Sequence, residues 1–441
     1  MFDCNRLQKL DPRRLRAAHR TAGHHSARHH SAGHHSAGHR TAAVLAASAL
    51  VLAGCGNSHG AAQSGSSTLT IGISLSLTGD FASSGKAAER GYDLWANTVN
   101  AKGGVLNRKV QLKIVDDASS PNQVVTNYQN LINRDHVDLV FGPFSSLLTI
   151  PSSVVVNRYR YAFIEPAGGG PAVFAQNLHN LFFVQPAPTV QSGMVFADYI
   201  LSLPASRRPK TAAYPSLDDP FASPIADAVR QRFEAAGIKT VYSAIYPAET
   251  SDVTSIISKV AAADPDVVVA GTQSLDAFAD VRAMIQLKWA PKWLFLSNGA
   301  NSPTDFPAAV GMANTTGIFS SGDWFAGSTA SGSSAFAAAY VKAYGGTANQ
   351  IDSTSAEAYS CGMLLEEVAA KTGKIDNATI INTLHSGTWP TLEGDLSWNA
   401  AGAPQGSYLL EQWIDGTLQA VYPANRAEHA PVTVPLAWSG R

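Results

Sequence analysis

The stretch LTIGISLSL at residues 69–77 places apolar side chains at every second position, with Ile71 and Ile73 among them. This alternation predicts a β-strand. Residues 85–100 carry apolar residues at the spacing of one helical face, and residues 110–115 form a second short apolar run. A strand, a helix and a strand in this order predict a parallel βαβ unit.

The same order continues along most of the chain. Further strands are predicted at 137–141, 161–164, 211–214, 241–245, 267–270, 293–296 and 317–321, and helices at 122–134, 147–158, 224–236, 253–263, 276–287, 333–344 and 354–371. Two parallel sheets of this size are too much for one α/β domain. The sequence therefore predicts an α/β protein with two doubly wound lobes.

Composition supports a globular body with a mildly acidic surface. Of the 441 residues 45% are hydrophobic and 15% are charged. Residues 1–54 hold 8 of the 32 Lys and Arg and 2 of the 33 Asp and Glu, which leaves a net charge of −7 for the remainder. A nucleic-acid partner would need a basic face, so we expect none.

The N-terminal region predicts export. Residues 42–52 form an apolar run of 11, which is too short to span a bilayer but suits the core of a signal peptide. The run ends in Leu52-Ala53-Gly54-Cys55, which resembles the lipobox of bacterial lipoproteins. That resemblance implies a leader and signal peptide at 1–54, a lipid-anchored Cys55 and localisation on the extracytoplasmic face of the membrane. Residues 55–68, rich in Gly and Ser, then read as a flexible tether. The alternative is a buried apolar helix with a chance cysteine.

Histidine and cysteine offer no convincing metal or redox site. Eight of the 13 histidines precede residue 41, in a repeat that fits either a metal-binding tract or a leader without a structural role, the reading we favour. The pair Asp116-Asp117 fits a solvated turn better than a metal site. Cys361 lies in an Ala- and Leu-rich stretch and reads as a core residue.

Four motifs carry a family resemblance. They are Thr78-Gly79-Asp80-Phe81-Ala82-Ser83-Ser84-Gly85, Asn100-Ala101-Lys102-Gly103-Gly104-Val105, Asp116-Asp117 and Phe141-Gly142-Pro143-Phe144-Ser145-Ser146. In this combination the chain resembles the branched-chain amino-acid-binding protein family, of the type I periplasmic fold, from about residue 69 to residue 416.

The resemblance implies two lobes that close on a small-molecule ligand like a hinge. Three crossings join the lobes, near Pro188, Asp323 and Leu409. They divide the chain into lobe 1, residues 69–188 plus 324–408, and lobe 2, residues 189–323 plus 409–441. The family delivers amino acids or related carboxylates and amides to ATP-driven (ABC) importers. The implied protein is a monomer with an ABC permease as partner and with no cofactor or catalytic residue.

Ligands of open α/β sheets bind beyond the carboxyl ends of the strands. Ser145 and Ser146 lie between a predicted strand and a helix start, where hydroxyl and backbone N–H groups suit a carboxylate. Plain helix capping is the alternative. The turn Ala167-Gly168-Gly169-Gly170 would let backbone approach a ligand, or it is a loose turn.

The sequence departs from the family at four ligand-facing positions. A tyrosine is replaced by Ser84, a hydroxyl residue by Gly169, and another tyrosine by Gln273. The stretch around Asn298 lacks the acid that the family places against a ligand ammonium. We therefore expect analogues without an amino group to bind nearly as well as amino acids. Two aromatic residues, Phe221 and Trp324, either line the cleft or serve ordinary packing.

Enzyme motifs are weak. The Gly-x-Ser-x-Gly match at residues 56–60 lacks the preceding strand that a hydrolase nucleophile needs, and no dinucleotide or Walker motif follows a strand. A ligand-sensing lobe that signals through a membrane partner and an α/β hydrolase remain as alternatives to the transport-binding protein.

Overall fold

We describe the fold from a computed structural model, which covers residues 68–433 except 249 and 251, together with 436 and 438. The leader, Cys55 and almost all of the tether lie outside the described residues. Among the described helices, none combines the length and apolar character that a membrane crossing needs.

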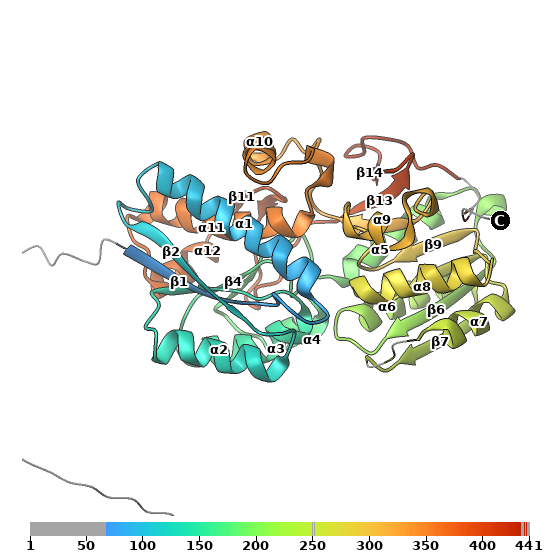
Figure 1. The fold of residues 1–441 in the computed structure, drawn as a ribbon, viewed down its shortest axis with the longest axis horizontal. Helices are drawn as coiled ribbons and strands as arrows, with labels where there is room; N and C mark the ends of the chain where they lie inside the picture. Colours follow the sequence, from blue (N-terminus) through green and yellow to red (C-terminus); the bar gives the residue numbers. More distant parts are fainter. Residues whose placement is uncertain (1–67, 249, 251, 434–435, 437, 439–441) are drawn as a thin grey trace, which may run out of the picture. The chain divides into compact units, whose positions relative to one another are not determined.

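The first sheet is fully parallel and has the strand order β2-β1-β3-β4-β5 (Figure 1). Its strands are β1 (Thr68–Leu75), β2 (Lys109–Asp116), β3 (Leu139–Phe141), β4 (Phe163–Glu165) and β5 (Leu181–Phe183). The order places β1 inside the sheet, between β2 and β3, which agrees with the complete burial of Ile71 and Ile73.

Helices cover both faces of this sheet. The first face packs against α1 (Ala82–Ala101), α11 (Ser353–Thr372) and α12 (Asn377–Leu384). The other face packs against α2 (Pro121–Asn133) and α3 (Ser146–Arg158). Three smaller elements and a hairpin complete this region: α4 (Pro171–Ala175), α10 (Ser333–Tyr344), a 3₁₀ turn (Ala348–Gln350) and the pair β11 (Trp389–Thr391) and β12 (Gly394–Leu396).

Local chemistry explains where several of these helices begin. The Ser120 side chain accepts a hydrogen bond from the Gln123 N–H at the start of α2, and Pro121 occupies the first turn. Asp352 accepts from the Thr354 N–H at the start of α11, and Asp376 does the same for α12. Such caps satisfy N–H groups that have no partner inside the helix.

The second sheet has the order β14-β13-β10-β9-β8-β6-β7. Its strands are β6 (Thr211–Leu217), β7 (Lys239–Tyr246), β8 (Val267–Ala270), β9 (Trp293–Leu296), β10 (Phe319–Gly322), β13 (Leu409–Ile414) and β14 (Thr417–Tyr422). β13 runs antiparallel to β10, and β14 runs antiparallel to β13. The sheet is therefore parallel with an antiparallel edge.

Both faces of the second sheet are also covered. One face packs against α7 (Thr254–Ala263), α8 (Ser274–Gln286) and α9 (Asp305–Val310). The other packs against α5 (Val190–Ser202) and α6 (Ala222–Ala235). Short 3₁₀ turns lie at Ala205–Arg207 and Met312–Asn314. The prediction of two doubly wound lobes is thus confirmed, and the second sheet adds an antiparallel edge to its parallel strands.

The predicted elements all occur, with shifts of a few residues at their ends. The sequence analysis did not identify the helices α4, α5, α9 and α12 or the strands β5, β11, β12, β13 and β14. Three of these strands have three residues each, which is too short to show an alternating pattern. The chain passes from the first sheet to the second at 184–189, at 323–332 and at 397–408, between the elements that flank each segment.

Candidate functional site

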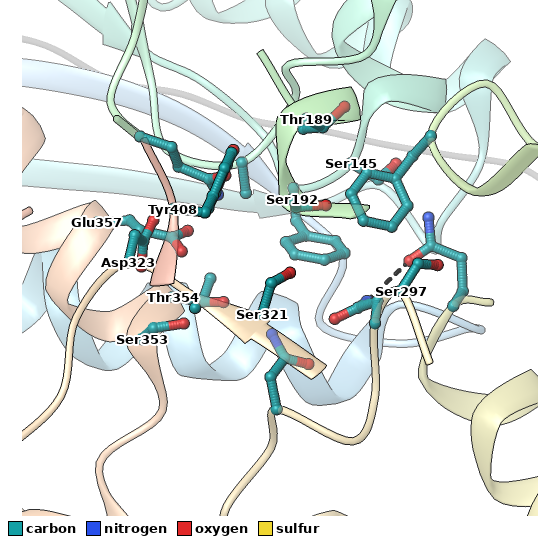
Figure 2. Close-up of a pocket in the computed structure, with 18 residues that line it drawn as sticks. Ser145, Thr189, Ser192, Ser297, Ser321, Asp323, Ser353, Thr354, Glu357 and Tyr408 are labelled. Carbon is teal, nitrogen blue, oxygen red and sulfur yellow. Dashed lines mark hydrogen bonds between the residues drawn. The ribbon is translucent and has the colours of Figure 1, made fainter. Parts of the chain in front are cut away.

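A cavity of about 60 Å³ lies where segments of both sheets meet (Figure 2). This volume has room for a few water molecules or the polar group of a small solute. Its 18 lining residues are Phe144, Ser145, Ala167, Gln185, Thr189, Ser192, Phe221, Gln273, Ser297, Asn298, Asn301, Ser321, Gly322, Asp323, Ser353, Thr354, Glu357 and Tyr408. Most of them are hydroxyl or amide residues, and none is a Lys, Arg or His.

Ser145 presents a free hydroxyl to this pocket from a strained backbone. It follows β3 and precedes α3, and its carbonyl oxygen accepts the Thr149 N–H at 3.0 Å. Its φ of 79° and ψ of 147° lie near a region that only glycine adopts easily. The hydroxyl makes no capping bond and is buried without a partner. The capping alternative therefore does not apply to the Ser145 side chain, which is left available for a ligand.

The Ser146 hydroxyl, by contrast, holds two loops together. Its hydroxyl accepts the Gly170 N–H at 2.9 Å, which joins the loop after β3 to the loop after β4. Ser146 is not among the lining residues of the pocket.

The glycine run after β4 serves close packing of the chain against itself. A Cβ on Gly168 would lie 2.1 Å from the Thr149 hydroxyl, and one on Gly169 would lie 2.2 Å from the Phe183 ring. Neither glycine lines the pocket, while the neighbouring Ala167 does. The Ala167 N–H already donates to Glu165 at 3.1 Å, and its carbonyl accepts the Ser145 N–H at 2.9 Å. The expected backbone donor at Ala167 is thus already in use.

Amide side chains form the wall contributed by the second sheet. Asn298 Nδ2 donates to Gln273 Oε1 at 2.9 Å, and Gln273 Nε2 donates to Asp219 Oδ1 at 3.3 Å. Gln273 also caps α8, where Asp276 completes a capping box. Asp219 in turn accepts the N–H groups of Phe221 and Ala222. This wall is therefore neutral at Asn298, the position where the family places an acid.

Acidic residues enter the pocket from elsewhere. Asp323 follows β10, and Glu357 lies in the second turn of α11. Figure 2 shows their carboxyl groups next to each other, beside Tyr408. Both residues are almost completely buried, and both oxygens of Asp323 and Oε2 of Glu357 have no hydrogen-bond partner among the described residues. Burial raises the pKa of each carboxyl group, and the negative charge of Asp323 raises the pKa of Glu357 further.

The pocket brings together five of the residues predicted from the sequence, namely Ser145, Ala167, Phe221, Gln273 and Asn298. Ser84 is not among them, because it is buried within α1. The neighbouring Ser83 instead bridges the lobes through a hydrogen bond from its hydroxyl to Asp305. Trp324 is also absent from the lining: its indole N–H donates to Ser333, and its ring packs edge-on against Phe336.

The structure also corrects the prediction that Asp116 and Asp117 form a solvated turn. Asp117 is completely buried and accepts hydrogen bonds from the hydroxyls of Ser74 and Ser76, so the solvated-turn prediction is wrong for it. Asp116 accepts from the N–H groups of Leu77 and Thr78. No cluster among the described residues has the three acidic, His or Cys side chains that could hold a metal ion. The pair therefore shapes the first loop.

Sequence reasoning missed the contribution of α5 and α11. Ser192 of α5 is buried with an unpartnered hydroxyl, and Ser353, Thr354 and Glu357 approach the pocket from the start of α11. One usable signal was present. Glu357 is the single charged residue in the run from Ser353 to Leu365, most of whose members are apolar or small.

Comparison with known proteins agrees with this geometry. The sequence matches the periplasmic binding protein family over residues 68–417. The chain belongs to that family. Members of this family are solute-binding proteins of the extracytoplasmic type and not enzymes, so membership speaks against the hydrolase alternative.

Individual relatives of this periplasmic binding protein are distant. An amino acid binding protein of Pseudomonas aeruginosa is 31% identical over 49% of this chain and 57% of its own length. The match thus spans little more than half of that relative. Leu/Ile/Val-binding protein homolog 1 of Brucella abortus is 26% identical over 78% of this chain and 90% of the relative.

Solved structures confirm the type I periplasmic fold. A leucine-binding protein from Thermotoga maritima superposes with a TM-score of 0.71 at 16% identity, covering 80% of this chain and 97% of its own. A solute-binding protein from R. palustris in complex with benzoate has a TM-score of 0.70 at 18% identity, covering 83% and 100%.

The strain at Ser145 is testable by two substitutions. Ser145→Gly removes the hydroxyl and the strained backbone together, whereas Ser145→Ala removes the hydroxyl alone. Strain of this kind costs about 1–3 kcal/mol. We expect the Gly variant to melt a few degrees above both the Ala variant and the wild type in thermal unfolding without ligand. As a control, Ser146→Gly should lower the melting temperature, because it removes the bond to Gly170 and relieves no strain. A Gly variant no more stable than the wild type would contradict the strained conformation.

The buried Glu357 should make stability depend on pH. Its folded pKa is raised, so its contribution to stability is present at acidic pH and is lost as the pH rises through the folded pKa. Glu357→Gln keeps the shape and removes the titration. We expect it to raise the melting temperature of the ligand-free protein at pH 8 by about 2 °C or more, and to change it less at pH 5. Glu367→Gln, on the exposed side of the same helix, is the control. An equal effect of Glu357→Gln at both pH values would contradict a raised pKa.

Proposed function

We propose that this periplasmic binding protein is the solute-binding lipoprotein of an ABC importer. In this role it captures a branched-chain amino acid or a related small polar solute in the cavity between its lobes. The observation that carries the proposal is the pocket between the two sheets, which is lined by two buried and unpartnered hydroxyls, those of Ser145 and Ser192. Buried polar groups normally have partners, so unpaired ones that line a cavity indicate a bound polar molecule.

The ligand's carboxylate or equivalent polar group belongs at Ser145. This hydroxyl is a free donor at the carboxyl end of β3. Two aromatic rings, Phe144 and Phe221, also line the pocket and suit the apolar part of a solute. The names of the relatives, which include leucine- and Leu/Ile/Val-binding proteins, support an amino-acid-like ligand.

We further propose that lobe 1 (residues 69–188 plus 324–408) and lobe 2 (residues 189–323 plus 409–441) open and close about their three connections. One contact across the cleft is polar, the hydrogen bond from the Ser83 hydroxyl to Asp305. Two lobes joined by connecting segments can rotate about these segments as hinges and close around a ligand.

Leucine binding tests the proposal. Leucine at saturating concentration should raise the melting temperature, because a ligand of the folded state stabilises it by mass action, and should reduce the radius of gyration in small-angle scattering. Calorimetry should show binding by the wild type and a loss of about tenfold to a hundredfold in Ser145→Ala, since one hydrogen bond to a charged group contributes about 1.5–3 kcal/mol. Isoleucine, valine and 4-methylpentanoate extend the panel. If no member binds, the proposed ligand class is wrong.

Lipid anchoring is tested separately. In a bacterial host that processes lipoproteins, the wild type should fractionate with membranes, and Cys55→Ser should move to the soluble fraction. The physical reason is that acyl chains on Cys55 would supply the membrane affinity. Cys361→Ser, which changes a buried cysteine, is the matched control and should stay with the membranes. Unchanged fractionation of Cys55→Ser would contradict anchoring through this residue.

A further inference from the structure

Two neighbouring acids and no cationic residue line the ligand pocket. Asp323 and Glu357 are 4% and 3% exposed, and three of their four carboxyl oxygens are buried without a hydrogen-bond partner. None of the salt bridges found among the described residues involves either acid. No described salt bridge therefore compensates either carboxyl group, and their side-chain interactions are with each other and with Gln185.

The surroundings add negative charge. Glu393, in the turn of the β11–β12 hairpin, and Glu411 of β13 are both buried, and the charge of Asp323 raises the pKa of each. Among the described residues, Arg426 is a cation with an electrostatic interaction with Asp323. Its guanidinium donates a hydrogen bond to the Ser407 carbonyl at 2.9 Å and not to an acid. Arg426 does not line the ligand pocket.

Buried carboxylates without a cation are costly, and removing water from them increases that cost. A protein can avoid the cost by protonating one carboxyl group so that the two share a proton. It can also avoid it by receiving a cation from outside. The first solution needs no opening to the ligand pocket, yet both acids line it, together with the free hydroxyls of Ser145 and Ser192.

We propose that Asp323 and Glu357 form a subsite for a cationic group, so that the ligand carries an ammonium or a comparable cationic donor. The inference rests on the proposed function and narrows its ligand class. It places the cation between the start of the second connection and α11, and not at Asn298, where the second sheet offers only amides. It is the opposite of what the absence of an acid near residue 298 predicts from the sequence.

Matched trios of probes test the charge preference. The first trio is leucine, 4-methylpentanoate and 3-methylbutylamine, and the second, with its charges further apart, is 4-aminobutanoate, butanoate and butylamine. Calorimetry on the wild type should show that the best-binding compound carries an ammonium. Its analogue without the ammonium should bind at least about a hundredfold more weakly, which corresponds to about 2.7 kcal/mol. A carboxylate that binds as tightly as its amino counterpart overturns the inference and leaves the proposed function standing.

Variants locate the subsite. Asp323→Asn, Glu357→Gln and the double variant should each reduce the preference for the ammonium compound by about tenfold or more, and binding of the plain carboxylate should stay the same or improve. Glu367→Gln removes the same charge from the exposed side of α11 and should leave the preference unchanged. Thermal unfolding verifies that each variant is folded. If the double variant does not fold, the two single variants decide the test.

The outcomes distinguish a failure of the cation subsite from a failure of the proposed ligand class. A preference that persists in the folded Asp323→Asn and Glu357→Gln variants shows that the acids only share a proton, and overturns the inference. Absence of binding by all six compounds overturns the proposed amino-acid-like ligand and the inference with it.

Discussion

Parallel strands covered by helices on both faces impose the constraint on which the rest of this structure depends. Every strand of such a sheet must satisfy its backbone within the sheet and its side chains against helices, so polar groups can gather only where the strands end. In this protein the carboxyl ends of β3 and β4 meet those of β8, β9 and β10 around one cavity. The position of the site follows from the topology, whatever residues occupy it.

Within that frame, much of the polar chemistry near the pocket is used to hold loops in place. Ser146, Thr189 and the Ala167 carbonyl each form a hydrogen bond with a neighbouring loop. Ser145 is the exception, since its backbone is strained and its hydroxyl is unpartnered. Strain that persists in a native fold is commonly found where a side chain must point in a functional direction. The surrounding bonds to Ala167 and Thr149 are what hold Ser145 in this conformation.

The two acids that line the pocket beside the second connection also reduce stability at a place where a ligand could bind. Asp323 and Glu357 lower the stability of the empty protein at neutral pH, because burial disfavours their charged forms. A cationic ligand would remove the cost of burying these two carboxyl groups. Part of the binding free energy would then come from relieving this cost of the ligand-free protein. Because Asp323 lies at the start of a segment that joins the two lobes, binding of a cationic ligand there would also favour closure of the lobes.

The sequence by itself determined the fold class and the strand ends where the candidate site lies, and it predicts an export signal. These features are local: alternating strands, helical faces and an apolar run before a cysteine can each be read within a few residues. Ser145, Ala167, Phe221, Gln273 and Asn298 could be placed near the pocket because each follows a strand. Only the tertiary structure decided the sign of the pocket's charge, since Glu357 reaches it from the second turn of a helix that begins more than 200 residues after Ser145. It also decided that Ser146, Gly168 and Gly169 serve packing and that Trp324 points away, because contacts between loops distant in sequence leave no periodic pattern.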